Sequence, residues 1–293
     1  MPKNTKTRKP PSQKTEDPSN PPPPTYYFPF AGYTSAVGVH TTLLAFSALF
    51  LPRTSHLVDF IKLNIDPSQI TSKDRPQHPF LDDLTLSPTS TLAWLCVGAI
   101  VLQSWWGGWI RSWWVESALQ STGIERRVDR TRIDARKYSN LLNAWLATGA
   151  TSLVLHFVLI LFGAPLLIHV WKTYLLALLV SVLVVFPPAY TIGVPIGSVL
   201  TWMTWVRIFA EFSLRTPVER AMLYPAFGTV VGCWIGVIPI ALDWDRPWQA
   251  WPLTPALGAI LGYILSSIAA LTANALSFLA DEHLRSAAKI KTN

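Results

Sequence analysis

Charged residues are scarce in this chain. Only 14% of its 293 residues are Asp, Glu, Lys or Arg, whereas 50% are hydrophobic and the mean hydropathy is +0.31. Soluble domains carry about 25% charged residues, and segments that are apolar on every side are typical of membrane-spanning helices. The scarcity of charge therefore excludes an ordinary soluble domain and predicts an all-α polytopic membrane protein.

Cysteine is also rare, because the chain contains only Cys96 and Cys233, and both lie in apolar runs. This placement excludes a disulfide framework or a cysteine-rich zinc site and predicts two packing residues. The sequence also lacks the G-x-S-x-G, H-E-x-x-H, Walker and dinucleotide-binding motifs. We therefore predict no cofactor, no bound metal and no catalytic residue of these classes.

Aliphatic residues are nearly absent from residues 1–29, which are rich in proline and lysine. Such a segment cannot bury a core, and no apolar signal-peptide region follows its basic start. We predict a disordered cytosolic tail over 1–29, a membrane domain over 30–276 and a second cytosolic tail over 277–293. The net charge of +7 does not indicate nucleic-acid binding, because the basic residues lie between apolar runs.

Six segments are long enough to cross a bilayer, which requires about 20 mostly apolar residues. The predicted spans are 30–51, 91–110, 141–162, 170–190, 222–242 and 255–276, and they form a bundle of about six transmembrane helices. A seventh apolar stretch, IGVPIGSVLTWMTWV (192–206), is shorter and contains Pro195. We expect this stretch to be re-entrant or interfacial.

Lysine and arginine are distributed unevenly about the predicted membrane. With a cytosolic N-terminus, 18 of the 24 basic residues fall on the cytosolic side, in 1–29, 111–140, 191–221 and 277–293. Because basic residues are enriched in cytosolic loops, both termini are predicted to be cytosolic and residues 243–251 lumenal. The terminal KIKTN fits a cytosolic dilysine signal, which predicts the endoplasmic reticulum membrane.

Other ionisable side chains do not form a catalytic set. His40 and His156 lie within predicted spans with no carboxylate one helical turn away, which favours a role in helix contacts. A further group is predicted to form a solvated, charge-mixed cytosolic loop, and it comprises Glu211, Arg215, Glu219 and Arg220.

The segment IPIALDWDRPWQAWP (238–252) crowds acids, an arginine and tryptophans beside a hydrophobic span. If 247–252 forms a helical turn, its tryptophans share one face and anchor the turn at the membrane interface, and Asp243 can pair with Arg246. Three other hypotheses remain: a D-x-D pair that holds a metal and a sugar donor, a phosphate contact through the arginine, or a protein-docking surface. The predicted partner or lipid contacts are Asp243, Trp244, Asp245, Arg246, Trp248 and Trp251.

Glycines recur every four residues in the fifth predicted span. Such a stripe lets another helix backbone approach closely. The stripe comprises Gly228, Gly232 and Gly236, and the sixth span repeats the spacing at Gly258 and Gly262. We expect the two spans to pack as a hairpin, with a helix of a partner subunit as the alternative.

The segment GTVVGCWIGVIPIALDWDRPWQAWPLT (228–254) resembles the signature of the PIG-F family, phosphatidylinositol-glycan class F. LILFGAPLL (159–167) resembles a second motif of that family, and we assign its Gly163 and Pro165 to helix packing. ERAMLYPAFG (219–228) resembles the family's approach to the fifth span. The resemblance covers about 141–265, and we find none in the first two spans or the basic loop before it.

The resemblance implies a non-catalytic subunit of the endoplasmic reticulum in glycosylphosphatidylinositol (GPI) anchor assembly. It implies that the chain binds and stabilises the class O and class G ethanolamine-phosphate transferases, which act on the later mannoses of the GPI precursor. Membrane lipids, including phosphatidylethanolamine or the GPI precursor, are further expected contacts. The alternative hypothesis is a small membrane-embedded transferase or lipid-handling protein that uses Asp243 and Asp245 directly.

Overall fold

The computed structural model describes residues 28–53, 79–118, 136–196, 198–242, 244 and 246–292. Every regular element within these residues is helical, which confirms the all-α prediction. The elements are α1 (Phe30–Phe50), η1 (Leu51–Arg53), α3 (Pro79–Leu86), α4 (Pro88–Ala118), α6 (Lys137–Leu161), α7 (Val170–Val184), α8 (Phe186–Thr191), α9 (Val199–Trp205), η3 (Val206–Ala210), α10 (Pro217–Ile235), η4 (Ile238–Ala241), η5 (Pro247–Gln249) and α11 (Leu253–Thr292).

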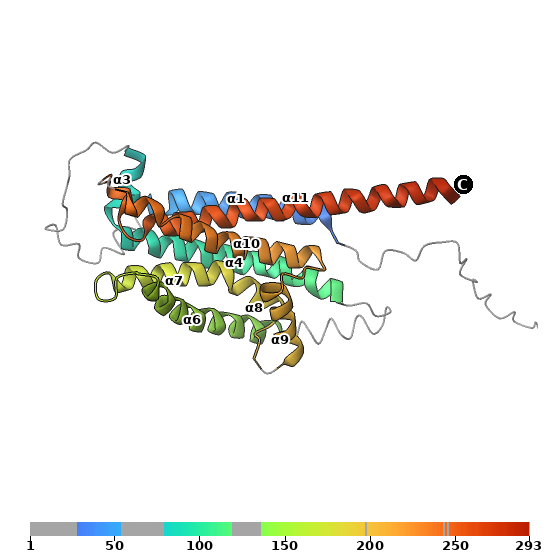
Figure 1. The fold of residues 1–293 in the computed structure, drawn as a ribbon, viewed down its shortest axis with the longest axis horizontal. Coiled ribbons are helices and arrows are strands. Elements are labelled where there is room, and N and C mark those ends of the chain that lie inside the picture. Colours follow the sequence, from blue (N-terminus) through green and yellow to red (C-terminus); the bar gives the residue numbers. More distant parts are fainter. Residues whose placement is uncertain are drawn as a thin grey trace, which may run out of the picture.

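The long helices lie side by side in an elongated bundle with two distinct ends (Figure 1). The first, which we call the α3 end, carries α3, η4, η5 and the connection between α6 and α7. The opposite α9 end carries α8, α9 and the start of α10 (Figure 1). Both the first and the last described residues lie on the α9 side, so the described helices cross the bundle an even number of times.

The predicted spans agree with the helices of the bundle. Within the described part of the chain, five helices are long and apolar enough to cross a membrane: α1 with η1, α4, α6, α10 with η4, and α11. The sixth crossing is α7 followed by α8, which together occupy the span predicted at 170–190. Its helix is interrupted at Val185 because Pro187 and Pro188 lack backbone N–H groups and fit only the first turn of a new helix.

The stretch predicted as re-entrant or interfacial forms α9 and η3, which lie across the α9 end instead of along the bundle (Figure 1). Ser198 begins α9, because its hydroxyl accepts a hydrogen bond from the N–H of Thr201 at 3.4 Å. No residue of α9 is buried. Its large exposed side chains are Val199, Leu200, Trp202 and Met203.

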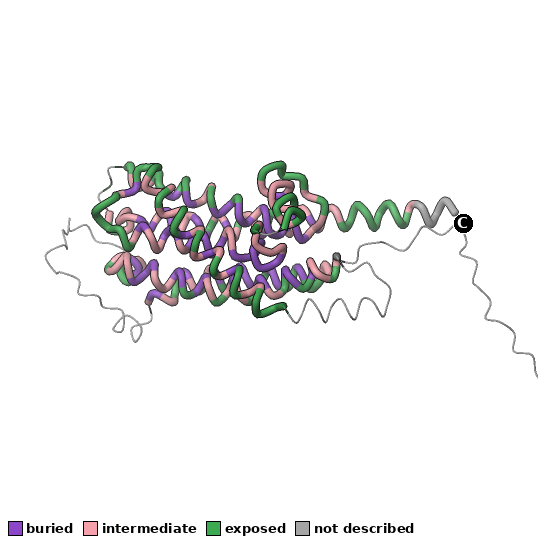
Figure 2. The backbone as a smooth tube through the Cα atoms, turned by 90° about the horizontal axis from the view of Figure 1, so that it is seen from below, coloured by how far each residue is buried: buried purple, intermediate pink, exposed green. Residues whose placement is uncertain are grey.

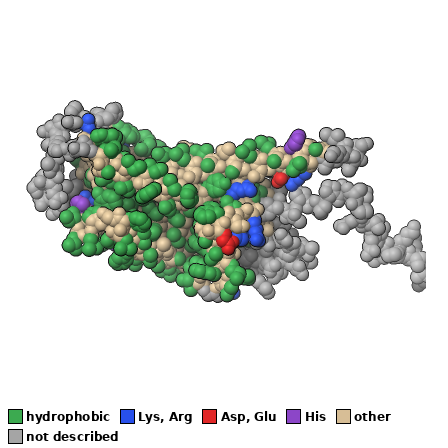
Figure 3. Space-filling view, in the orientation of Figure 1, with side chains coloured by type: hydrophobic (Ala, Val, Ile, Leu, Met, Phe, Trp, Pro, Cys, Tyr) green, Lys and Arg blue, Asp and Glu red, His purple; other side chains and the backbone are tan. Residues whose placement is uncertain are grey.

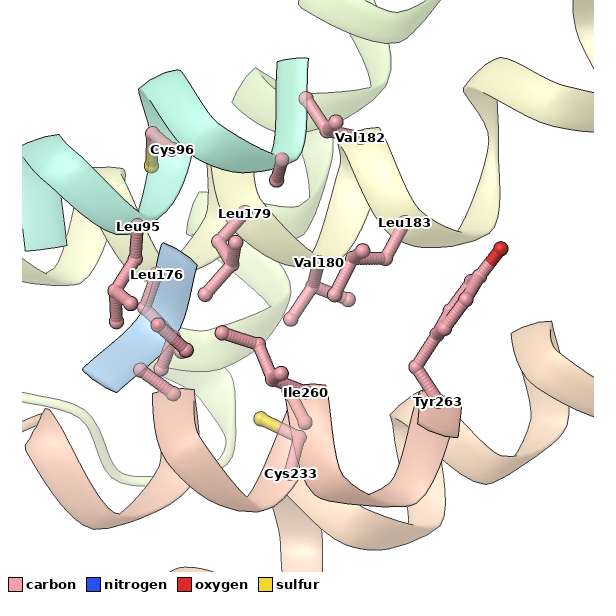
Figure 4. Packing of buried hydrophobic residues seen from close by; sticks show 14 of the residues in the cluster. Leu95, Cys96, Leu176, Leu179, Val180, Val182, Leu183, Cys233, Ile260 and Tyr263 are labelled. Atoms are coloured by element: carbon pink, nitrogen blue, oxygen red, sulfur yellow. The ribbon is translucent and has the colours of Figure 1, made fainter. Parts of the chain in front are cut away.

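The core lies between α4, α7, α10 and α11. Buried and exposed residues alternate along the helices of the bundle, whereas the extension of α11 is exposed (Figure 2). Leu179 and Leu183 of α7 pack toward Ile260 of α11 in the largest cluster (Figure 4). Cys96 and Cys233 are buried, free thiols in the same cluster, which confirms their prediction as packing residues.

The last helix is longer than the predicted span 255–276. α11 has 40 residues and continues to Thr292, so the predicted tail over 277–293 is largely a helical extension beyond the bundle (Figure 1). The continuous apolar stretch used to predict the span ends near residue 276. The residues after it include Ala, Leu, Glu and Arg, which are strong helix formers, so the helix continues. The predicted tail over 1–29 lies almost entirely outside the described residues.

Candidate functional site

The connection between α10 and α11 is folded around the side chain of Gln249. Its Nε2 donates hydrogen bonds to the carbonyl oxygens of Pro239 at 2.6 Å and Leu242 at 2.7 Å. Its Oε1 accepts a hydrogen bond from the backbone N–H of Arg246 at 2.8 Å. The side-chain amide of Gln249 therefore joins η4, the irregular backbone that follows it, and η5. It can do so because an amide supplies both hydrogen-bond donors and an acceptor.

Gln249 is not among the site residues predicted from the sequence. A lone amide side chain among prolines and tryptophans was the available signal, since proline-rich backbone leaves carbonyl groups without N–H partners.

Changing Gln249→Glu is expected to destabilise this turn by about 1–3 kcal/mol, because a carboxylate oxygen would face two carbonyl oxygens that have lost their donor. The measurement is thermal unfolding of the purified protein in detergent. Asn143→Asp makes the same chemical change on the exposed surface of α6 and serves as the control. Equal melting temperatures for the two variants would contradict the bridging role.

The three tryptophans of the turn do not share one face as predicted. Trp244 and Trp248 contact each other with ring centroids 5.7 Å apart and an interplanar angle of 61°. The indole N–H of Trp251 instead donates to the hydroxyl of Thr173 on α7 at 3.0 Å. The prediction was wrong because 247–249 forms only one 3₁₀ turn, which is too short to align the three rings.

Asp243 and Asp245 lie outside the described residues, and so does the predicted ion pair of Asp243 with Arg246. Arg246 itself is half-buried. Within the residues that the structure describes, no three His, Cys, Asp or Glu side chains are grouped so that they could hold a metal ion.

The connection between α6 and α7 lies at the same end of the bundle as this turn (Figure 1). Gly163 adopts φ +101°, a conformation that favours glycine. A Cβ there would meet nothing within 4 Å, so the assignment of Gly163 to helix packing was wrong, and Pro165 lies in the same connection outside any helix. The connection carries an exposed apolar surface, which we call the 161–171 surface and which comprises Leu161, Phe162, Leu166, Leu167, Ile168 and Trp171.

The two glycine rows face each other across the contact of α10 with α11. A Cβ at Gly232 would overlap the carbonyl oxygen of Gly258 and lie 3.0 Å from Cα of Gly262. A Cβ at Gly236 would lie 2.5 Å from the carbonyl oxygen of Thr254. The two backbones therefore touch with no room for side chains, as in other membrane helix pairs with small residues at the interface.

A buried ion pair at the α9 end corrects part of the prediction of a solvated loop, because Glu219 is buried whereas Glu211 and Arg215 are exposed. Both oxygens of Glu219 accept hydrogen bonds from the guanidinium of Arg207, at 2.5 and 3.1 Å, and only 2% of the Glu219 side chain is exposed. The hydrogen bond to Glu219 raises the pKa of Arg207 above its usual value. Oε2 of Glu219 also accepts the backbone N–H of Arg215 at 2.6 Å.

A capping box fixes the Glu219 side chain at the start of α10. The hydroxyl of Thr216 accepts the N–H of Glu219 at 3.2 Å, and the Glu219 carboxylate accepts the N–H of Thr216 at 3.3 Å. The sequence T-P-V-E was the signal for this arrangement, because Ser or Thr followed three residues later by Glu marks a helix start. Arg220 is also engaged, since it donates to Asn274 and Ser277 of α11 at 3.1 Å each.

The family model described as "GPI biosynthesis protein family Pig-F" matches residues 77–271. The match confirms the resemblance and corrects its extent, because it includes α3, α4 and the basic loop 111–140, which lie outside the predicted extent of about 141–265. No solved structure matches the chain.

Three curated relatives illustrate the similarity. The chain is 42% identical over 117 residues to a PIGF/3-ketodihydrosphingosine reductase fusion protein of Schizosaccharomyces pombe, which covers 40% of this chain and 22% of the relative. It is 38% identical over 133 residues to glycosylphosphatidylinositol anchor biosynthesis protein 11 of Neurospora crassa, covering 44% of this chain and 45% of the relative. It is 33% identical over 111 residues to the mouse protein named GPI ethanolamine phosphate transferase, stabilizing subunit. That alignment covers 38% of this chain and 48% of the relative.

These alignments span less than half the length of each relative. The family match, in contrast, extends over most of the described membrane bundle, from before α3 into α11. The chain therefore belongs to the PIG-F family of GPI biosynthesis proteins.

Proposed function

We propose that the chain is a non-catalytic membrane subunit that binds and stabilises an ethanolamine-phosphate transferase in GPI-anchor biosynthesis. The observation that carries this proposal is the family match, together with the name "stabilizing subunit" of the mouse and human relatives. The class O and class G transferases, which modify the later mannoses, are the proposed catalytic partners.

The α3 end offers the surface that suits such a partner. The 161–171 surface is apolar and exposed, with Leu167 87% exposed, and exposed apolar patches commonly mark interaction sites. The Trp244–Trp248 pair lies at the same end of the bundle, and tryptophan is enriched at interface hot spots. The charge distribution supports a lumenal position for this end, with both termini in the cytosol of an endoplasmic reticulum membrane.

Affinity purification of the tagged full-length chain from detergent-solubilised membranes tests the proposal. A class O or class G transferase is expected to co-purify, and its steady-state level is expected to fall when the chain is removed. If no ethanolamine-phosphate transferase co-purifies and transferase levels are unchanged, the proposal is wrong.

Changing Leu167→Ser together with Ile168→Ser is expected to reduce co-purification of the transferase by about tenfold, because two exposed apolar contacts are lost. The melting temperature of the isolated chain should stay the same, since neither side chain is buried. Leu284→Ser, on the exposed helical extension of α11, is the control and should co-purify normally. Loss of co-purification in the control alone would place the contact elsewhere.

The alternative hypothesis, direct chemistry by Asp243 and Asp245, makes a different prediction. The purified chain alone would then turn over phosphatidylethanolamine with a GPI intermediate in a metal-dependent reaction, and Asp243→Asn would abolish it. Under the subunit proposal the isolated chain shows no turnover with these substrates.

A further inference from the structure

A groove opens between α10 and α11 near the α9 end, away from the surface proposed for the transferase. It has a volume of about 520 Å³ and an almost wholly apolar lining. Its walls are Phe212, Leu223, Tyr224, Phe227, Ser266 and Ala269. The volume falls within the range of about 300–1,000 Å³ that is typical of small-ligand sites.

The groove follows from the unequal sizes of the facing side chains. Close contact of the glycine rows brings α10 and α11 together, with Ser266 against Gly228, and α11 contributes only Ser266 and Ala269 to the lining of the groove. The rings of Phe212 and Phe227, which also line the groove, contact each other with centroids 6.5 Å apart and an interplanar angle of 89°. The two rings are 57% and 59% exposed, so the groove opens to the outer surface of the bundle.

Phe212 is held in place by its backbone. It adopts φ +53°, which is unusual for a non-glycine residue and favours a functional explanation when the surroundings enforce it. Arg207 enforces it here, since its guanidinium donates to the carbonyl oxygen of Ser213 at 2.6 Å while it pairs with Glu219. The ion pair therefore fixes one wall of the groove.

Two arginines lie close in sequence to residues that line the groove. Arg215 follows Phe212 by three residues and is exposed, and Arg220 precedes Tyr224 by one helical turn on α10. On the visible face, lysine and arginine side chains gather toward the α9 end, while the middle is hydrophobic (Figure 3). An apolar groove whose lining residues are followed or preceded by arginines within four residues matches an acyl chain and its phosphate, because guanidinium binds phosphate well.

The dimensions favour a single acyl chain over a protein helix. A helix with its side chains is about 10–12 Å wide and would need a long, continuous contact strip. The groove instead has a volume of about 520 Å³, in the small-ligand range, and the contacting rings of Phe212 and Phe227 form one wall of it.

We propose that this groove binds one acyl chain of a glycerophospholipid from the leaflet at the α9 end, with its phosphate beside Arg215. The site does not depend on the transferase, so it is expected in the isolated chain.

Photolabelling of the full-length chain in phosphatidylcholine nanodiscs tests the site. The probe is a phosphatidylcholine with a diazirine on one acyl chain, and labelled residues are located by mass spectrometry. Labelling is expected to concentrate on Phe212, Tyr224 and Phe227. Ala269→Trp, which fills the groove, should lower this labelling by at least about tenfold, whereas Ala150→Trp on the exposed face of α6 should not change it.

Two further experiments test the role of the phosphate and provide a substitute for a variant that does not fold. A diacylglycerol with the same diazirine chain lacks phosphate and should label the groove less, and Arg215→Gln should lower labelling by the phospholipid only. If Ala269→Trp does not fold, Phe212→Ala, which removes an exposed wall, carries the same expectation. If α6 and the groove are labelled equally, and the variants leave this labelling unchanged, the probe is contacting the protein from the bulk bilayer. That result would overturn the proposal. Loss of labelling when a transferase is present would assign the groove to a protein helix and overturn it too.

Discussion

Changing Gly232→Leu is expected to prevent α10 from packing on α11 and to remove most of the folded protein. Even the first carbon of the new side chain would overlap the carbonyl oxygen of Gly258. Backbone atoms cannot rotate away as a side chain can, so the helices must separate. We expect a loss of roughly 3 kcal/mol or more, at or above the upper range for overpacked cores.

The measurement is the amount of monodisperse protein after detergent extraction and its melting temperature. Gly149→Leu is the matched control, because Gly149 lies within α6 and a Cβ there would meet nothing within 4 Å. Leucine also favours helix by up to about 1 kcal/mol over glycine, so the control should be neutral or stabilising. The melting temperature of Gly232→Ala should lie between those of Gly232→Leu and Gly149→Leu. A wild-type melting temperature for Gly232→Leu would disprove the close contact.

Changing Glu219→Gln is expected to cost roughly 3 kcal/mol, because Arg207 would remain largely buried without its counter-charge. This free-energy cost lies at the low end of the range for breaking a buried ion pair, because 18% of the Arg207 side chain remains in contact with solvent. The substitution keeps the size of the side chain, so the effect reports charge instead of packing. We also expect α9 and η3 to detach from α10, which limited proteolysis of this segment would detect.

A double-mutant cycle separates the pair from its surroundings. Arg207→Met alone should also destabilise, but Arg207→Met with Glu219→Gln should recover part of the loss, because no unpaired charge stays buried. Glu282→Gln, on the exposed extension of α11, is the control and should change stability by less than about 0.5 kcal/mol. Strictly additive losses in the double variant would contradict direct coupling.

Hydropathy was sufficient to predict the bundle. The spans at 30–51 and 141–162 agree with α1 and α6 to within a few residues, because the need for about 20 apolar residues is a strong constraint. The helix ends were less predictable. The extension of α11 is polar, and hydropathy cannot distinguish a polar helix from a polar tail.

The site was predicted less completely than the fold. The signature around 238–252 identified the family, but the role of Gln249 depends on which carbonyl groups lack partners once the turn has formed. Glu219 was assigned to solvent because its neighbours are charged. Burial depends on the packing of η3 against the start of α10, which a linear charge pattern does not contain.

The length of α11 has a mechanical consequence. Its 40 residues make a rod about 60 Å long, roughly twice the thickness of the hydrocarbon layer. One end of the rod begins at the Gln249 turn and the other stands free of the bundle (Figure 1). Because the helix is continuous, it holds the exposed Glu282 and Arg285 in a fixed direction beyond the bundle, which a flexible tail would not do.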